Sequence, residues 1–288
     1  MKKTLIALAA VAASSVALAQ NVTISGAMGV AFEKHGATDG ELVNSDGGNG
    51  VNFTGTEDLG GGLKVTFRFN PRFSSVSGAT TGTALAQNAS VSLSGGFGTL
   101  QFGREGMASA AGFDAFSAFG NAGNYGWSGK VGAREDKIML YTSPTIGGFS
   151  VRAAMTANNA NIGNEFTYFR ASYSAGPLAL TVAQEKNPST VAGTKGATDK
   201  EFALSYNLGV AKVMAVSGKA GNAATESTIG ATVPMGAITL KAAYQNAAAN
   251  VFAIGADYAL SKRTRGFADL GKASGAKAAY RVGIQHSF

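Results

Sequence analysis

Apolar and polar residues alternate with a period of two along most of this chain, whereas the helical period is nearly absent. In the segment LKVTFRFN (63–70), Leu, Val and Phe fall on one parity, and Lys, Thr, Arg and Asn fall on the other. The final segment YRVGIQHSF (280–288) alternates up to its last residue, with His286 as the one polar residue on the apolar parity. Such alternation indicates β-strands with one apolar and one polar face. Comparable runs lie at 22–32, 90–94, 149–156, 202–207, 238–245 and 252–258, and the pattern is blurred at 210–220 and 262–272.

Turn signals divide these runs, and tight turns alternate with longer polar connections. We count sixteen strands in this pattern, with seven tight turns and eight longer connections. The tight turns lie at 57–62, 95–98, 143–148, 174–177, 207–210, 234–236 and 260–263. The longer connections lie at 33–48, 73–86, 105–135, 158–164, 187–198, 221–225, 247–250 and 273–276. Membrane-spanning β-strands of about 9–11 residues have this arrangement, with short turns on one side and longer loops on the other.

A soluble antiparallel sandwich is the alternative, since it also alternates, with its apolar face turned inward. Three features favour a membrane barrel. Only 14% of the residues are charged, which is few for water-exposed outer faces. The aromatic residues lie near strand ends, as they do in interfacial girdles. An even strand number with alternating loop lengths suits an up-and-down barrel, whose closure leaves no strand edge in lipid.

The polar parity of such a barrel faces its interior. The residues of that parity are mainly Thr, Ser, Asn, Gln, Lys and Arg, which are hydrophilic enough to contact water. A barrel of about sixteen strands leaves an aqueous channel. The pattern therefore predicts an all-β, transmembrane, up-and-down antiparallel β-barrel that forms a pore. We expect Tyr280 and Phe288 to lie in the closing strand, which would pair with VTISGAMGVAF (22–32) and place Phe288 in an aromatic girdle.

The first twenty residues, MKKTLIALAAVAASSVALAQ, have the features of an export signal. Two lysines form a positive start, a short apolar stretch follows, and Ala-Leu-Ala before Gln20 fits the cleavage rule for small residues. We expect a cleaved signal peptide at 1–19 and a mature barrel at 20–288. Loss of the two lysines would lower the formal charge from +7 to +5. Since the chain has no Cys, a closed sheet or a large core must stabilise it without disulfides.

The sequence contains no recognisable catalytic or metal-binding constellation. His35 and His286 lie at opposite ends of the chain, and we interpret them as a loop residue and a strand-end residue. A Ser/His/Asp site needs a positioned His, and a zinc site needs a group of ligands. The glycines of GGFGTLQFG (95–103) precede no helix, which argues against dinucleotide binding. We expect no enzyme activity, no metal and no cofactor, and the basic residues are too dispersed along strands for a nucleic-acid site.

Six segments carry a resemblance to a known family: GTEDLGGGLKVTFRF (55–69), ASVSLSGGFGTLQFGRE (89–105), YTSPTIGGFSV (141–151), SYNLGVAK (205–212), YALSKRT (258–264) and VGIQHSF (282–288). In order along the chain, they resemble the general diffusion porins of Gram-negative bacteria, most closely the β-proteobacterial type that includes anion-selective members. The resemblance implies a homotrimeric outer-membrane barrel of sixteen strands. It also implies contact with outer-membrane lipid and lipopolysaccharide, and assembly by machinery that reads a C-terminal Phe such as Phe288.

The resemblance further implies that the third loop folds into the barrel and narrows it. In this chain that loop corresponds to 105–135, the longest connection. A long connection without strand character is uncommon unless it is functional or disordered, and five aromatic residues within this one argue against disorder. An external lid is the alternative interpretation. We expect the inward-folded constriction.

Basic residues dominate the predicted surface of the channel. The candidates are Lys64, Arg68, Arg72, Arg134, Arg152 and Arg170. The acids expected near the constriction are Glu105, Asp114 and Glu135. A basic wall facing an acidic loop would create a transverse field, and rings of Arg and Lys favour anions. Each cation alone is explained equally well as a residue that keeps the lumen hydrated.

In the anion-selective relatives an arginine corresponds to Arg134, whereas two further arginines are replaced here by Gly50 and by Gln87 or Asn88.

We therefore expect an outer-membrane general porin, a water-filled channel for passive diffusion of ions and small hydrophilic solutes with a modest preference for anions. Two other functions fit the same strand pattern. One is a substrate-specific outer-membrane channel, and the other is a non-channel, adhesin-like β protein that presents its loops. A saturable block of conductance by one solute would support the first, and fractionation without detergent would support a soluble β protein.

Overall fold

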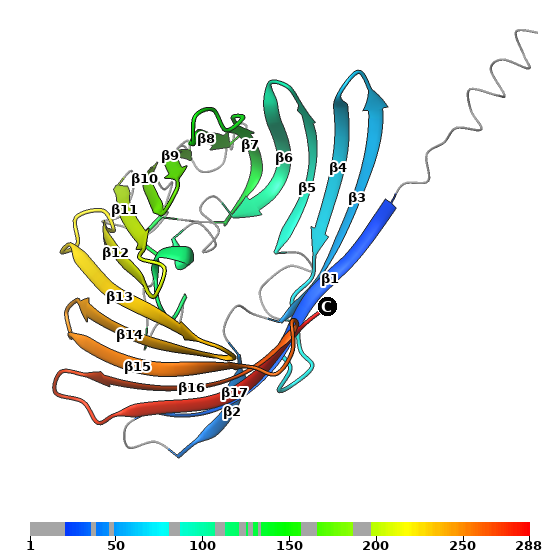
Figure 1. Cartoon of the computed structure of the whole chain (residues 1–288). Helices are drawn as coiled ribbons and strands as arrows, with labels where there is room; N and C mark the ends of the chain where they lie inside the picture. Colours follow the sequence, from blue (N-terminus) through cyan, green and yellow to red (C-terminus); the bar gives the residue numbers. More distant parts are fainter. Residues whose placement is uncertain are drawn as a thin grey trace, which may run out of the picture.

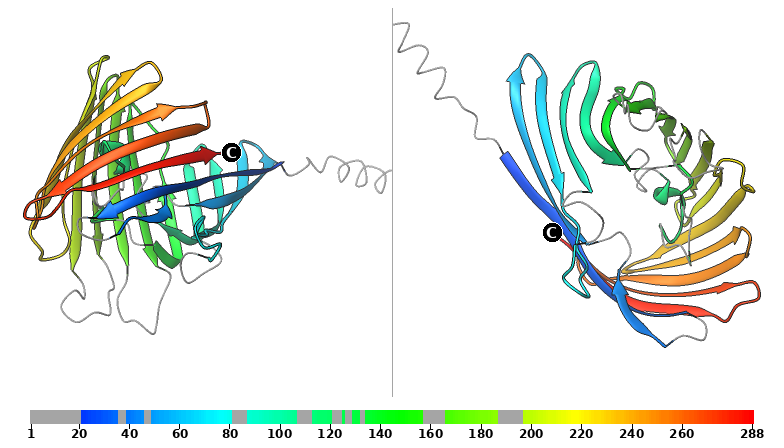
Figure 2. Two further views of the ribbon diagram at one scale, coloured as in Figure 1. Left: turned by 90° about the horizontal axis from the view of Figure 1, so that it is seen from below. Right: turned by 180° about the vertical axis from the view of Figure 1, so that it is seen from behind.

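The fold is an antiparallel β-sheet that closes on itself, in a computed structural model that describes residues 21–35, 39–45, 49–80, 87–106, 113–120, 125, 129–131, 134–156, 166–186 and 197–288 (Figure 1). The expected signal peptide at 1–19 lies outside the described residues. Figure 2 shows from two further sides that the tilted strands surround one common interior. No helix in the described part of the chain is long and apolar enough to cross a membrane.

The first half of the sheet begins at the N-terminus and continues to the middle of the chain. Its strands are β1 (Asn21–His35), β2 (Glu41–Asn44), β3 (Gly50–Gly60), β4 (Leu63–Asn70), β5 (Asn88–Gly95), β6 (Gly98–Gly106), β7 (Arg134–Thr142), β8 (Phe149–Thr156) and β9 (Thr167–Ala175). The second half contains β10 (Leu178–Lys186), β11 (Thr198–Asn207), β12 (Lys212–Lys219), β13 (Glu226–Met235), β14 (Ile238–Asn246), β15 (Val251–Ala259), β16 (Thr264–Ala273) and β17 (Ala279–Ser287). A short 3-10 helix, η2 (Asp114–Phe116), lies between β6 and β7.

The barrel has sixteen strands, because β2 and β3 together form one of them. Both pair with the same edge of β1, β2 with residues 30–33 and β3 with residues 21–27. In the gap between β2 and β3, the side chain of Asn49 forms hydrogen bonds with the backbone of Gly29 in β1. Its Oδ1 accepts from the backbone N–H of Gly29 at 2.7 Å, and its Nδ2 donates to the carbonyl oxygen of Gly29 at 3.2 Å. The expected connection at 33–48 is therefore partly strand, which the short segment ELVN did not indicate.

The predicted tight turns all lie between consecutive strands of the structure. The turn from β3 to β4 shows why: Gly60, Gly61 and Gly62 have φ angles of 80°, 60° and 81°, a conformation that residues with a Cβ rarely adopt. The two blurred segments are also strands, β12 and β16. Strand number, order and turn positions are thus confirmed.

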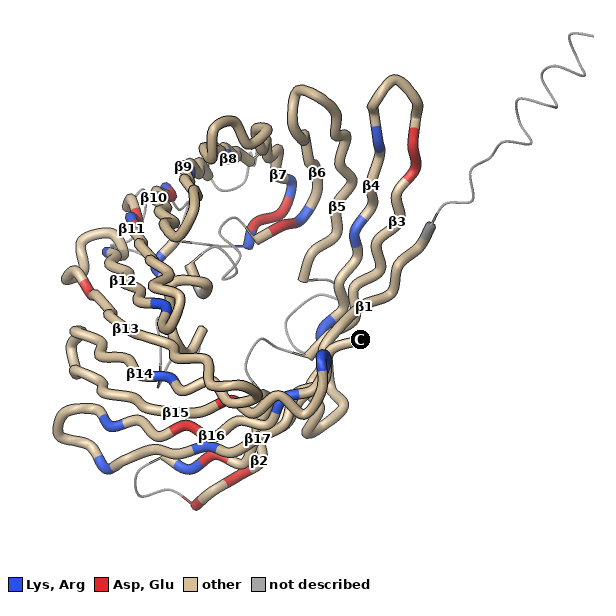
Figure 3. Tube along the Cα trace, in the orientation of Figure 1, with Lys and Arg blue, Asp and Glu red and all other residues tan. Residues whose placement is uncertain are grey.

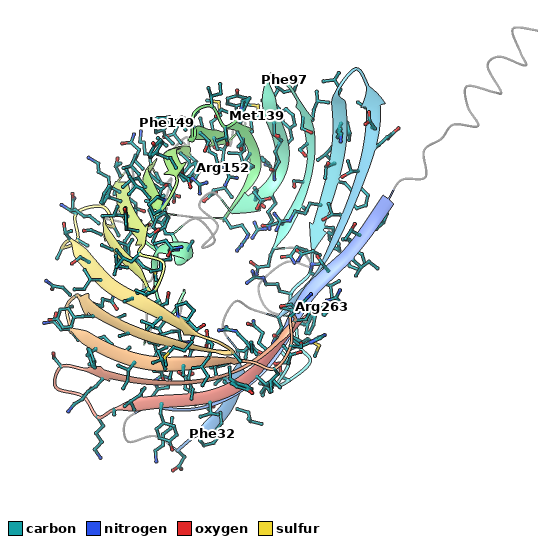
Figure 4. All side chains as sticks on the ribbon, viewed as in Figure 1. Phe32, Phe97, Met139, Phe149, Arg152 and Arg263 are labelled. Carbon is teal, nitrogen blue, oxygen red and sulfur yellow. The ribbon has the colours of Figure 1, made fainter. Side chains whose placement is uncertain are left out.

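The barrel turns its apolar side chains outward and its polar side chains inward, which is the reverse of a soluble protein. Phe202 points outward and is 46% exposed, whereas its neighbour Glu201 points inward and is only 3% exposed. The same alternation holds around the barrel, and Figure 4 shows Phe32 and Phe149 directed away from the interior while Arg152 is directed into it. An outer surface of large apolar side chains is compatible with lipid, and an interior of polar side chains is compatible with water.

The last strand closes the barrel, as the alternation of its residues predicted. β17 pairs with β1 from Ala27 opposite Ser287 to His35 opposite Ala279. Phe288 continues this pairing through two backbone hydrogen bonds with Gly26, at 2.8 and 3.0 Å. A Cβ added to Gly26 would lie 2.7 Å from the ring of Phe288, so glycine provides the space for the terminal ring. Figure 1 accordingly places the C-terminus beside β1.

Candidate channel constriction

The third loop folds into the lumen, where its first described part packs on the inner wall. Phe113 is 2% exposed, and together with Phe116 it joins a cluster of inward-facing side chains from β7 to β12. Ile138 and Leu140 of β7 and Val216 of β12 belong to this cluster. The helix η2 contacts β11 and β12 (Figure 1). Phe113 and Phe116, two of the aromatic residues that argued against disorder, therefore fix this part of the loop to the wall.

Polar contacts fix the same loop at two further points. The ammonium group of Lys212 donates to the carbonyl oxygen of Ala115 at 2.9 Å. Oε2 of Glu201 accepts from the backbone N–H groups of Lys130 and Val131, at 3.1 and 3.0 Å. The Lys130 ammonium group also pairs with Glu226 at 2.6 Å.

The middle of the loop reaches the C-terminal strands. Nζ of Lys241 lies 4.9 Å from the ring centroid of Phe119, and Cζ of Arg281 lies 4.6 Å from that of Tyr125. A Cβ on Gly255 would lie 2.9 Å from the Phe119 ring, so the glycine permits this approach. Burial, reinforced by the carboxylate of Glu33, raises the pKa of Tyr125 above its ordinary value. The loop thus crosses from β7 to the inner face of β14–β17.

Phe119 and Tyr125 rest on an ionic network inside these C-terminal strands. Asp269 accepts from Arg281 at 2.7 and 2.9 Å and pairs with Lys241 at 2.9 Å. Asp257 pairs with Lys241 at 2.8 Å and with Arg265 at 3.0 Å. Figure 3 shows the alternating basic and acidic segments on these strands. The sequence analysis missed this network, although all five residues fall on the polar parity of four successive strands.

Opposite this network lies a basic wall, which we define as Arg68 (β4), Arg72, Arg134 (β7), Arg152 (β8) and Arg170 (β9). Arg152 and Arg170 are directly opposed in the pairing of β8 with β9. Burial and the neighbouring guanidinium of Arg68 lower the pKa of Arg72, which follows the end of β4. Like charges held this close indicate a strongly positive part of the lumen.

Glu105 lies within the basic wall instead of facing it from the loop. Nη1 of Arg68 is 3.6 Å from its Oε2, and Nε2 of Gln101 donates to the same oxygen at 2.7 Å. Glu135 is directly opposed to Glu105 in the pairing of β6 with β7. We had expected Glu105 to belong to an acidic loop that faces the basic wall. Glu105 instead belongs to β6, which places its side chain within the wall itself.

The remaining candidates lie elsewhere. Lys64 is the second residue of β4, so it lies beside the tight turn between β3 and β4 and four residues before Arg68. The side chain of Asp114 lies outside the described residues. Among the described residues no group of three His, Cys, Asp or Glu side chains is arranged to hold a metal ion.

Gly50 and the pair Gln87 and Asn88, which the resemblance singled out as taking the place of arginines, border the basic wall. Gly50 is bridged to Arg72, and a Cβ there would lie 2.8 Å from the carbonyl oxygen of Pro71. Asn88 accepts from Nε of Arg134 at 3.3 Å. In this chain Arg72 therefore lies next to one of these positions and Arg134 next to the other.

A closed barrel with an apolar exterior, a charged interior and an inward-folded loop defines a membrane channel. The chain matches the profile of the Gram-negative porins over residues 4–277, and it belongs to this family. It is similar to outer membrane porin protein 32 of Delftia acidovorans, with 30% identity over 94% of this chain and 89% of the relative. It is also similar to the major outer membrane protein P.IB of Neisseria gonorrhoeae, with 32% identity over 58% of this chain and 52% of the relative.

Solved structures show the same fold. The anion-selective porin from Comamonas acidovorans superposes with a TM-score of 0.76 and 24% identity, covering 93% of this chain and all of that one. The loop-deletion variant of OmpT from Vibrio cholerae superposes with a TM-score of 0.70 and 16% identity. Family and fold together make this chain a channel-forming protein of the bacterial outer membrane.

Proposed function

We propose that this porin is a general diffusion channel that conducts small anions in preference to cations. One observation carries the proposal: five arginines form the basic wall, against the two opposed carboxylates Glu105 and Glu135. A positively charged constriction raises the local concentration of anions and excludes cations. Since Glu105 offsets part of this charge, we expect the preference to be modest.

The size limit of the channel comes from the third loop in this proposal. The loop crosses the lumen between the aromatic cluster on β7–β12 and the ionic network on β14–β17. Solutes must pass between this loop and the basic wall. Transport through such an opening is passive and involves no turnover chemistry.

Reversal potentials across planar bilayers under a KCl gradient test the proposal. We expect the sign of an anion-selective channel and a conductance that rises with salt without saturation. A reversal potential of the opposite sign would reject the anion preference. Saturable block by a single solute would replace the general channel with a substrate-specific one.

The assembly of the protein completes the proposal. We infer a homotrimer in contact with outer-membrane lipid and lipopolysaccharide, folded by machinery that reads Phe288 after residues 1–19 are removed. Family membership and the exposed apolar exterior support this inference. An oligomer that resists SDS until it is heated, with a mature N-terminus at Gln20, is the expected result.

A further inference from the structure

Asn49 and Gly50 form the only Asn-Gly sequence in the chain, and they lie in the barrel wall at the gap between β2 and β3. Asparagine is one of the thermolabile residues, and a following glycine makes it most reactive because no Cβ hinders the approach of the glycine nitrogen to the asparagine side chain. The side chain of Asn49 is only 1% exposed. A chemically labile pair therefore occupies a buried joint of the wall.

The joint requires an amide at position 49, because the side chain both accepts and donates hydrogen bonds. Its Oδ1 accepts from the N–H of Gly29 at 2.7 Å. Its Nδ2 donates to the carbonyl oxygen of Gly29 at 3.2 Å, to Oδ1 of Asn44 at 3.0 Å and to Oγ of Ser75 at 2.8 Å. A carboxylate can only accept. An aspartate here would lose the donors and would place a buried charge beside two acceptor oxygens.

The joint also requires a glycine at position 50. A Cβ there would lie 2.8 Å from the carbonyl oxygen of Pro71 and 3.1 Å from Cγ of Arg72. The first of these neighbours is backbone, which cannot turn aside as the end of a flexible side chain can. Both members of the labile pair are thus fixed by the packing, and a more durable sequence would not fit the gap.

The reaction of such a pair is an internal displacement of ammonia. The backbone nitrogen of Gly50 bonds to Cγ of Asn49 and loses its proton, while the bond from Cγ to Nδ2 breaks and Nδ2 leaves as ammonia with that proton. Water then opens the resulting succinimide ring, at Cγ to give an aspartate or at the main-chain carbonyl carbon to give an isoaspartate. The net change consumes water and releases ammonia, so it needs no enzyme, oxidant or cofactor.

The folded barrel prevents this attack. Hydrogen bonds hold both polar atoms of the Asn49 side chain, and Gly50 is fixed opposite Ala27 in the pairing of β3 with β1. Neither restraint exists in the unfolded chain. Because the barrel closes by pairing its first strand with its last, the whole chain has to be present before closure completes this protection.

We propose that Asn49 and Gly50 are a site of spontaneous deamidation in the unfolded chain. Folding requires the unmodified amide and stops the reaction, so a chain that waits too long before it folds loses the ability to form this joint. The folded barrel keeps its asparagine. The site is independent of the ion selectivity of the channel.

The test follows the purified protein in concentrated urea at mildly alkaline pH. Samples taken over time are digested, and mass spectrometry measures the replacement of NH2 by OH in the peptide that contains Asn49. We expect progressive conversion in urea and none in folded protein kept in detergent in the same buffer. The peptide that contains Asn207, which precedes Leu208, is the internal control and should remain unconverted.

Each sample is also folded into detergent micelles, and the folded band is separated from the unfolded band on unheated SDS gels. We expect the folded yield to fall by the converted fraction, with converted chains confined to the unfolded band. Gly50→Ala should slow the conversion in urea. That measurement reads only mass, so it holds even where the variant does not fold.

Two matched variants introduce the product charge directly. Asn49→Asp should lower the ratio of folded to unfolded protein about tenfold, as expected when buried polar groups lose their partners. Asn207→Asp makes the same chemical change at an exposed turn, where Oδ1 accepts from the N–H of Gly209 at 2.9 Å and a carboxylate can accept the same bond. Its folded yield should be normal.

Equal conversion of Asn49 in folded and unfolded protein would overturn the proposal, as would no conversion in urea. Converted chains found in the folded band in the same proportion as in the unfolded band would show that the joint tolerates the change. Equal folding of the two Asp variants would show the same. Reversal potentials do not enter any of these measurements, so their outcome leaves the proposed channel function untouched.

Discussion

The guanidinium of Arg281 stacks on the ring of Tyr125, with Cζ 4.6 Å from the ring centroid. The contact joins the last strand of the barrel to the third loop, and Phe267 lies on another side of the same guanidinium at 5.3 Å. Arg281 is simultaneously held by Asp269. The position of the loop across the lumen therefore depends on a charge network that the closing strand completes.

Replacing Tyr125 with Ala should loosen the third loop. A cation–π contact contributes about 0.5–2 kcal/mol, and its loss would let this part of the loop move away from β17. We expect a larger and noisier single-channel conductance. Tyr125→Phe keeps the stacking ring and should behave as the unmodified protein does. Equal conductance of the Ala and Phe variants would mean that this contact does not set the channel width.

Replacing Glu105 with Gln should strengthen the anion preference. The carboxylate lies 3.6 Å from Arg68, and a unit charge at about 4 Å is worth about 1 kcal/mol in water. The anion-to-cation permeability ratio should thus rise by up to about fivefold at low salt, and less at high salt because of screening. Glu57→Gln, at an exposed residue beside the tight turn after β3, is the control. A ratio that falls in the Glu105 variant would contradict the assignment of the basic wall.

Replacing Asp269 with Asn should destabilise the barrel. The change leaves Arg281 and Lys241 without their shared carboxylate, whose side chain is fully buried. Breaking a buried pair costs about 3–5 kcal/mol. The temperature at which the folded band disappears in SDS gels should fall, whereas Asp39→Asn at an exposed position should leave it unchanged. No shift in the Asp269 variant would show that water in the lumen compensates these charges.

Deleting Phe288 should reduce the yield of folded protein in the membrane. The residue forms two backbone hydrogen bonds with Gly26 and completes the seam between β17 and β1. Quantitative blotting of outer-membrane fractions measures the effect. Phe97→Ala, which removes another exposed aromatic ring at the turn from β5 to β6, serves as the control. A normal yield after the deletion would mean that neither closure of the barrel nor its assembly in the membrane requires Phe288.

The alternation of the chain was sufficient for most of the fold because the membrane imposes a simple rule on it. Each strand must present apolar residues to lipid and polar residues to water, so residue parity assigned Arg68, Arg152 and Arg170 to the lumen. The segment ELVN (41–44) was missed because an alternation cannot be recognised in four residues with only two apolar side chains. Its pairing with β1 depends on Asn49, which lies close to Gly29 only after folding.

Sequence alone determined the class of fold, the positions of the tight turns and of most strands, the direction of the side chains wherever the alternation is clear, and the set of basic residues on the polar parity. Only the tertiary structure decided which charges meet. Strand register placed Glu105 among the arginines and brought Asp269 between Lys241 and Arg281. Register depends on pairing between strands distant in sequence, and the course of the third loop depends on aromatic contacts with β7–β17. Neither is encoded in the parity of a single strand.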